Sequence, residues 1–196
     1  MPRIEAPTIH EHVRQQAERL LDAASALFRR QGFHGTDMGD IAAAVGLARN
    51  SLYRYYSSKE RILIACVERD MGPYLQQLES LEAAYPDPRA RIDAWIDAAI
   101  DIATSPAHAT MGLISEIRES APDLRAQILQ LHQLPSKVLE GAIRALLGRQ
   151  DRDPALLTAM VAGMVQSGAA QAIRRDTTVA VKSELKSAVA RLLQSP

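Results

Sequence analysis

The chain has 196 residues, of which 47% are apolar and 23% charged, and equal numbers of cationic and anionic side chains give it no formal net charge. This composition is typical of a globular protein and excludes a fibrous or disordered chain. The single cysteine, Cys66, excludes an internal disulfide and a multi-cysteine metal site. We expect it to be a small buried apolar side chain. The first residues contain no apolar signal core, so we expect a cytoplasmic protein.

Apolar residues recur at helical spacing along the chain, and no segment has the sustained alternation of a strand, so the sequence predicts an all-α fold. The nine predicted helices cover residues 9–31, 38–45, 49–55, 59–81 with a bend or restart at Gly72-Pro73, 89–104, 107–119, 123–147 with an interruption near Pro135, 154–173 and 179–193. We predict an N-terminal three-helix module, residues 1–58, followed by a six-helix body, residues 59–196.

Residues that favour helix starts divide the first module further. Asp37, with Asp40 three positions later, is expected to cap the second helix, and Ser57 with Glu60 forms the pattern of a capping box for the fourth. Ala48 precedes the third helix and offers no side-chain cap. Two short helices joined by a turn at Gly46, behind a longer helix that packs on both, are typical of a helix-turn-helix unit.

The third predicted helix carries the polar side chains suited to DNA. In a helix-turn-helix this second short helix enters the major groove. Arg49 can donate twice to guanine, Asn50 can pair with adenine, and Ser51 can bind a base or a phosphate. Tyr53 lies four residues after Arg49 and can donate to a phosphate, whereas Tyr56 is expected in the core or at its boundary. A basic cluster of this kind can also be only a solvated face.

Lys59 lies in the first turn of the fourth helix, where exposed N–H groups already favour an anion. The sequence therefore predicts a phosphate clamp there, although a lysine in an exposed first turn is common without any such role.

The stretch from Gly32 to Ile64 resembles the DNA-binding signature of the TetR family of bacterial transcriptional regulators. It has an aromatic residue after glycine, Thr before a short helix, an Ile-Ala pair, a glycine turn, Leu-Tyr, an aromatic pair and Ser-Lys-Glu. The resemblance implies an all-α homodimer that binds a palindromic operator in double-stranded DNA and represses until a small molecule enters a pocket in the body. It also implies phosphate contacts by Thr36 and Lys59 and groove contacts by Arg49–Ser51 and Tyr53. Two positions depart from the family pattern. Asp37 stands where the family usually has Thr or Ser, and Ala48 stands where Ser is common.

Less common side chains on the apolar helices of the body are the candidates for an effector pocket. The core is the favoured place for Trp95, and His108 can be a surface or internally bonded residue. No His or acid pair at i, i+4 supports a metal site, and no cofactor is expected. The candidates are Tyr74, Trp95, His108, Met111, Glu116 and His132. Pro73, in the helix linking module and body, can be a moving hinge or a fixed kink.

The last two helices carry the expected dimer interface. Small residues recur every four positions near Gly163 and Ser167, which allows close approach of another helix. Residues 155–173 also approach the length of a membrane span, but we interpret them as a helix buried between other helices. Two apolar stripes favour a four-helix interface with a twofold mate. The interface candidates are Met160, Gly163, Ser167, Leu185 and Val189.

A transcriptional repressor is therefore the leading interpretation. An activator or an effector-independent DNA-binding regulator is the alternative. A helical enzyme is less favoured, because the sequence has no recognisable nucleophile with a base, no paired carboxylates and no glycine-rich phosphate loop.

Overall fold

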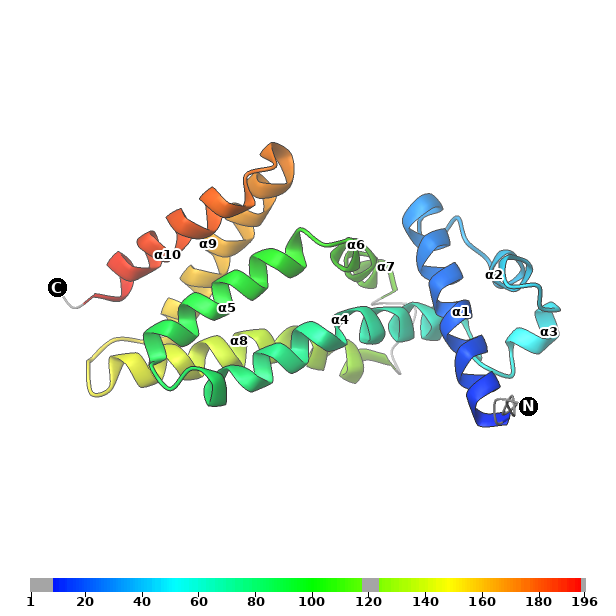
Figure 1. The fold of residues 1–196 in the computed structure, drawn as a ribbon, viewed down its shortest axis with the longest axis horizontal. Helices are drawn as coiled ribbons and strands as arrows, with labels where there is room; N and C mark the ends of the chain where they lie inside the picture. Colours follow the sequence, from blue (N-terminus) through cyan, green and yellow to red (C-terminus); the bar gives the residue numbers. More distant parts are fainter. Residues whose placement is uncertain (1–8, 118–123, 195–196) are drawn as a thin grey trace, which may run out of the picture. The chain divides into compact units, whose positions relative to one another are not determined.

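A computed structural model describes residues 9–117 and 124–194, and every regular element in these ranges is helical, as predicted. Figure 1 shows the helices in chain order. They are α1 (Ile9–Gln31), α2 (Met38–Ala44), α3 (Arg49–Leu52), α4 (Lys59–Ala84), α5 (Pro88–Ala103), α6 (Pro106–Gly112), α7 (Ile114–Ile117), α8 (Arg125–Leu147), α9 (Pro154–Arg175) and α10 (Thr178–Leu193).

The observed helices differ from the predicted ones at three kinds of place. The predicted helix 107–119 is divided into α6 and α7, so the described residues contain ten helices instead of nine. The third helix ends at Leu52 instead of residue 55. Helices α4 and α8 continue through Pro73 and Pro135. Each proline removes one backbone hydrogen bond, but long helices that bury an apolar face can absorb that loss.

Several helix starts follow from their capping residues. Asp37 Oδ1 accepts the N–H groups of Gly39 and Asp40 at 2.5 and 2.9 Å, and the Asp37 N–H donates to Asp40 Oδ2 at 2.9 Å. This reciprocal capping box confirms Asp37 as a cap. For α4 the predicted capping residue is wrong by one position. The Arg61 N–H donates to Ser58 Oγ at 3.3 Å, because α4 begins at Lys59 and Ser58 directly precedes it.

The chain divides into two compact units. The first comprises the residues up to Asp70 together with Ala109–Arg125, and the second comprises Met71–His108 and the residues from Ala126 onward. The first unit thus reaches beyond the boundary predicted at residue 58 and includes part of α6 and all of α7. Each unit has its own apolar core. Fully buried residues include Leu20, Phe28, Ile41, Leu52 and Ile62 in the first, and Ile92, Ile96, Ile143, Val161 and Val189 in the second.

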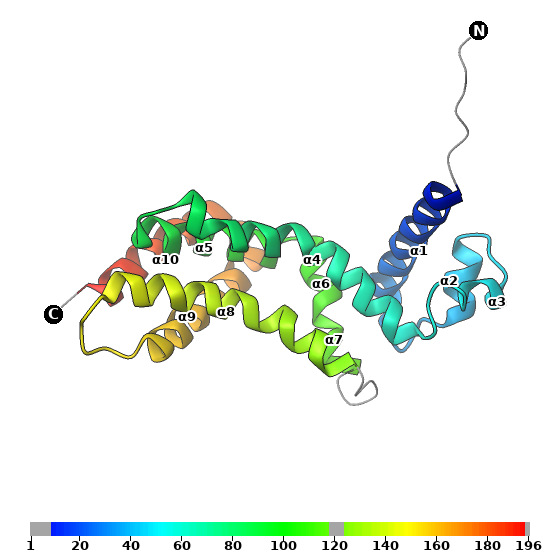
Figure 2. The same ribbon diagram turned by 90° about the horizontal axis from the view of Figure 1, so that it is seen from below.

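Within the second unit, α9 and α10 lie side by side and both pack against α5, as Figures 1 and 2 show. Ion pairs between α5 and α10 join Asp101 to Lys182 and Asp97 to Lys186. On α5, the Trp95 indole donates to the Pro135 carbonyl of α8 at 2.9 Å. These bonds fix α5 between α8 and α10.

Candidate nucleic-acid interface

A tight turn sets the position of α3 relative to α2. Gly46 has a φ of +68°, a conformation that is strained for residues with a Cβ. The Leu47 N–H donates to the Ala42 carbonyl at 2.9 Å and closes the turn. Leu52 and Ile41 are fully buried, so α3 is held to the core of the first unit on one side only. The opposite side of α3 faces outward.

The outward side of α3 carries the side chains predicted to bind DNA. Arg49, Asn50 and Tyr53 are exposed, with 44% of Tyr53 accessible, and Ser51 is half-buried. Arg54 is exposed beside them, and its Nη2 donates to Ser51 Oγ at 3.4 Å. Two guanidinium groups, an amide and a phenol therefore lie on one surface. Ala48 caps α3 without a side-chain hydrogen bond, as expected.

Arg54 was not among the predicted contacts, although its charge belongs to the basic cluster seen in the sequence. Its link to Ser51 joins positions three apart, a spacing that places two side chains on the same face of a helical turn. Because Arg donates in several directions, Arg54 can hold Ser51 and a phosphate at the same time.

Thr36 does not lie where the resemblance implies. Its side chain is only 1% exposed, and its Oγ1 donates to the Gly32 carbonyl at 2.9 Å. The hydroxyl therefore stabilises the turn between α1 and α2 and does not reach a phosphate. Gly32 itself has a φ of +74°, so this turn depends on a glycine at that position.

Lys59 is also occupied inside the chain. Its Nζ donates to the carbonyls of Phe33 and Thr36, both at 2.7 Å, and lies 4.1 Å from the centre of the Phe33 ring. The ammonium thus joins the start of α4 to the turn between α1 and α2, a structural role that the phosphate-clamp prediction did not include. The acceptor carbonyls lie 23 and 26 residues away in sequence, so no local pattern could have indicated them.

Behind this surface, α1 and α4 are tied by Arg69. Its guanidinium donates to Asp22 on α1 at 2.9 Å, to Asp70 at 2.8 and 2.9 Å, and to Ser25 at 3.5 Å. Nearby, burial raises the pKa of the Cys66 thiol to about 11. Cys66 is fully buried, which confirms it as a core residue.

The aromatic residues that follow α3 divide between surface and core. Tyr56 is half-buried, and burial raises the pKa of its phenol. Its position agrees with the predicted boundary role, whereas Tyr53 remains on the exposed side.

Comparison with known proteins supports the assignment of the N-terminal module as a helix-turn-helix that binds DNA. Residues 20–66 match the model of the bacterial regulatory proteins of the tetR family. The chain is 26% identical to the HTH-type transcriptional regulator RutR of Escherichia coli K12 over 156 residues, which cover 80% of this chain and 65% of RutR. It is 29% identical to the HTH-type transcriptional regulator BetI of Rhizobium meliloti over 146 residues, covering 73% of this chain and 70% of BetI. The match to RutR thus spans less than two thirds of that protein.

The fold agrees as well. The crystal structure of the transcriptional regulator FadR from Bacillus subtilis in complex with stearoyl-CoA superposes with a TM-score of 0.69 and 22% identity, covering 91% of this chain and 97% of FadR. Residues 20–66 thus form a DNA-binding domain of the tetR family.

The residues predicted for an effector pocket have different environments. Trp95 is buried with its indole N–H bonded to Pro135, so it is a satisfied core residue. His108 is exposed, and Glu116 is exposed with its carboxylate 3.6 Å from His34 Nε2. The predictions of His108 and Glu116 as pocket residues are therefore not supported, because solvent-facing side chains do not line an enclosed pocket. Met111 is half-buried.

Tyr74 remains a candidate, since it is buried and makes no hydrogen bond within the described residues. Burial raises the pKa of its phenol to about 12. The side chain of His132 lies outside the described residues. The sequence did not indicate Thr110, whose hydroxyl is fully buried and has no partner in the described part of the chain. Each of these two hydroxyls can accept or donate a hydrogen bond to a ligand.

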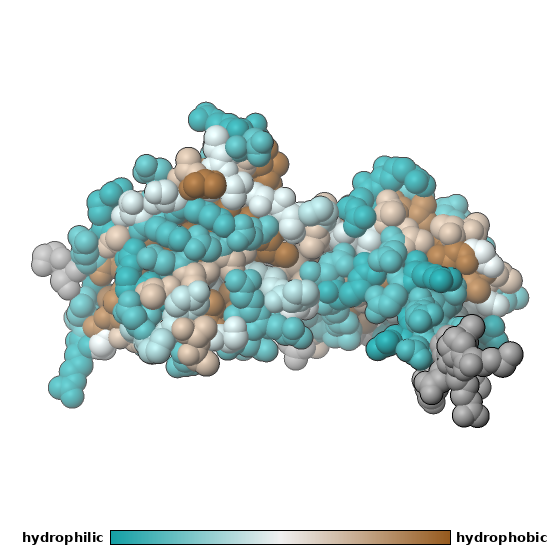
Figure 3. Space-filling view, viewed as in Figure 1, coloured by the Kyte–Doolittle hydropathy of each residue, from teal (hydrophilic) through white to brown (hydrophobic). Residues whose placement is uncertain are grey.

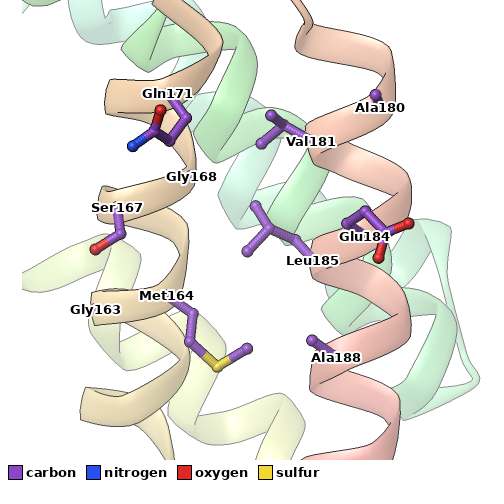
Figure 4. Close-up of a pocket in the computed structure, with 10 residues that line it drawn as sticks. All are labelled: Gly163, Met164, Ser167, Gly168, Gln171, Ala180, Val181, Glu184, Leu185 and Ala188. Carbon is purple, nitrogen blue, oxygen red and sulfur yellow. The ribbon is translucent and has the colours of Figure 1, made fainter.

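An open groove of about 700 Å³ runs between α9 and α10, and Figure 4 shows its walls. Gly163, Met164 and Ser167 line one side and Leu185 the other. Met160, on α9, is 46% exposed. Val189, in contrast, is fully buried within the chain and has no surface to offer to a partner, so its prediction as an interface residue is wrong.

Two glycines of α9, Gly163 and Gly168, have different surroundings. A Cβ at Gly168 would lie 2.8 Å from Leu185 Cδ1 and 3.1 Å from Val181 Cγ1, so this glycine permits α10 of the same chain to approach. A Cβ at Gly163 would meet nothing within 4 Å. The small-residue pattern of α9 therefore serves packing within the chain at one position and leaves a free surface at the other.

Helix α9 is long and apolar enough to cross a membrane by length and composition alone, and 33% of its apolar window is buried. It packs against α5 and α10, so the prediction of a helix buried between other helices holds only for that side of α9. Apolar surface is visible over α9 and α10 in Figure 3. An exposed apolar surface of this kind is typical of a protein-protein interface as well as of a membrane contact.

Proposed function

We propose that this protein is a transcriptional repressor that binds a palindromic operator as a homodimer and is released from it by a small molecule. The observation that supports this most directly is the exposed polar side of α3. Arg49 and Asn50 lie there on a helix that is anchored by a single buried leucine and free on its other side, and Tyr53 and Arg54 follow it directly. A major groove admits one helix of this size.

Each of these side chains suits a different part of the DNA. We propose that Arg49 and Asn50 read base edges, because their paired donors and acceptors match guanine and adenine. Tyr53 and Arg54 would bind phosphates and set the register. The carboxylate of Asp37 lies close to this surface in sequence, but it caps α2, and hydrogen bonds from Asp40 and Gly39 lower its pKa. Its negative charge therefore stabilises the N-terminus of α2.

A palindromic site requires two copies of α3 related by a twofold axis. We propose that the groove between α9 and α10 forms the twofold contact, with Gly163, Ser167 and Leu185 lining it and the exposed Met160 on the same helix outside it. Its support is an exposed apolar surface beside a glycine that leaves open space. Two copies would present their α3 helices to half-sites about 34–36 Å apart.

For the effector, we propose a ligand that hydrogen-bonds the buried hydroxyl of Thr110, with Tyr74 as the second residue to test. An unsatisfied buried hydroxyl costs about 1–3 kcal/mol, and a ligand group can recover it. Because FadR was crystallised with stearoyl-CoA, long-chain acyl-CoA is the first class of ligand to screen. A repressor of this type would act in the cytoplasm and catalyse no reaction.

The test is binding of the purified chain to fluorescent duplexes from the region upstream of its own gene, followed by anisotropy at several salt concentrations. We expect saturable binding to a palindromic duplex that weakens steeply with salt. Arg49→Ala should lower affinity by about 1–3 kcal/mol and relax the base preference at one position. Arg149→Ala, an exposed arginine outside α3, is the matched control. Equal binding by both variants would contradict the assignment of α3, and the absence of any DNA binding would contradict the function.

A further inference from the structure

A second, smaller groove of about 290 Å³ lies in the second unit between α4, α5 and α8, apart from α3 and from the α9–α10 groove. Its floor is apolar. Leu78 and Ala142 are each 1% exposed, and Val138 lies beside them. Gly141 opens the wall formed by α8, since a Cβ there would meet nothing within 4 Å. The floor can therefore accept a short aliphatic group.

A buried cation lies at one edge of this groove. Only 11% of the Arg91 side chain is exposed. Its Nε donates to the Tyr85 carbonyl at 3.2 Å, and its Nη2 donates to the Pro86 carbonyl at 3.5 Å. Its Nη1 has only the Glu82 carboxylate at 3.6 Å, beyond hydrogen-bond distance, and that glutamate is 85% exposed. One end of a buried guanidinium thus retains two N–H donors without a close acceptor among the described residues.

Two further charged side chains face the same groove and form no ion pair with each other within the described ranges. Glu79 lies on α4 and Lys137 on α8, and neither forms an ion pair within the described ranges. Together with Arg91 and Glu82 they give two cations and two carboxylates around an apolar floor. A purely anionic ligand would meet Glu79 and Glu82, and a purely cationic ligand would meet Arg91 and Lys137. A molecule that carries both charges satisfies all four.

We propose that this groove binds a small aliphatic zwitterion, with its carboxylate on Arg91 and Lys137, its ammonium on Glu79 and Glu82, and its apolar body on Leu78 and Ala142. The volume lies near the lower end of small-molecule sites, about 300–1,000 Å³, which fits a ligand of the size of a free amino acid. Charge-assisted hydrogen bonds from a guanidinium to a carboxylate are among the stronger ones in proteins.

The experiment is calorimetric titration of the full chain with L-leucine and with two analogues, isocaproate, which lacks the ammonium, and isoamylamine, which lacks the carboxylate. We expect L-leucine to bind with a Kd below about 1 mM and each analogue to bind at least about tenfold more weakly. No saturable binding of L-leucine up to about 10 mM, or equal binding of either analogue, would overturn the proposal.

Substitutions on α8 locate the site without disturbing the buried Arg91. Gly141→Leu fills the open wall of the groove and should abolish binding, while Ser136→Leu, an exposed position on the same helix outside the groove, should leave it unchanged. Circular dichroism melts check that both variants fold. Unchanged binding by a folded Gly141→Leu variant would also overturn the proposal. Because no DNA enters this titration, its failure is distinguishable from failure of the proposed repressor function.

Discussion

Replacing each of two glycines on α9 by alanine separates contacts within the chain from contacts with a partner. Gly163 and Gly168 lie five residues apart on the same helix, and both line the groove between α9 and α10. Only Gly168 is close to another helix of its own chain. The two substitutions add the same methyl group to the same helix, so each is the matched control of the other.

The expected magnitudes follow from the distances. Alanine in a helix interior gains about 1 kcal/mol over glycine, and this gain applies to both variants. At Gly168 the new methyl would lie 2.8 Å from Leu185 Cδ1 and 3.3 Å from Leu185 Cγ, so Leu185 must move. Overpacking of this kind costs about 1–3 kcal/mol. The free energy of unfolding of Gly168→Ala should therefore be about 1–3 kcal/mol lower than that of Gly163→Ala, measured where the chain is monomeric.

The assay is urea denaturation at two protein concentrations about tenfold apart, combined with sedimentation. The penalty at Gly168 should persist at both concentrations, because it arises within one chain. Any effect of Gly163→Ala on association should grow with concentration. If Gly168→Ala were as stable as Gly163→Ala at every concentration, the reasoning from the Leu185 contact would be refuted.

Three further substitutions test individual assignments. Met160→Lys places a charge on an exposed apolar position and should yield a folded monomer in sedimentation, whereas Val189→Lys, at a fully buried position, should prevent folding; a folded monomer from both would contradict the division between them. Lys59→Met removes two charge-assisted hydrogen bonds and should lower the free energy of unfolding by about 2 kcal/mol, with Arg30→Met as an exposed control; equal denaturation midpoints would argue against the carbonyl contacts. For Cys66, the folded pKa of about 11 lies above the ordinary value of 9.0, so the unfolded chain ionises first and stability should fall as pH rises from 9 towards 11. Cys66→Ala should lack this part of the decline, and identical pH profiles of the two proteins would contradict the burial effect.

The local sequence determined much of the N-terminal module. The 3.6-residue spacing of apolar side chains predicted α1 from Ile9 to Gln31, and the Asp37–Asp40 pair predicted the start of α2, because both signals act within one or two helical turns. The polar residues of α3 were also predicted as an exposed set, since Leu52 alone marks the buried side. Short-range patterns of this kind are complete in the sequence.

Other features depended on contacts between segments far apart in the chain. Thr36 and Lys59 have the chemistry of phosphate contacts, but Thr36 is buried and Lys59 donates to carbonyls 23 and 26 residues away. The sequence shows which side chains can donate hydrogen bonds, but the tertiary structure determines which acceptor groups lie within their reach.

The sequence by itself thus determined an all-helical chain, a helix-turn-helix and the residues on its exposed side, because helix periodicity and capping are local. Only the tertiary structure decided that Gly168 serves α10 while Gly163 stays open, that Val189 is core, and that Glu79, Glu82, Arg91 and Lys137 surround one groove. These outcomes depend on how helices distant in sequence pack, and packing is set by the shape of the whole core.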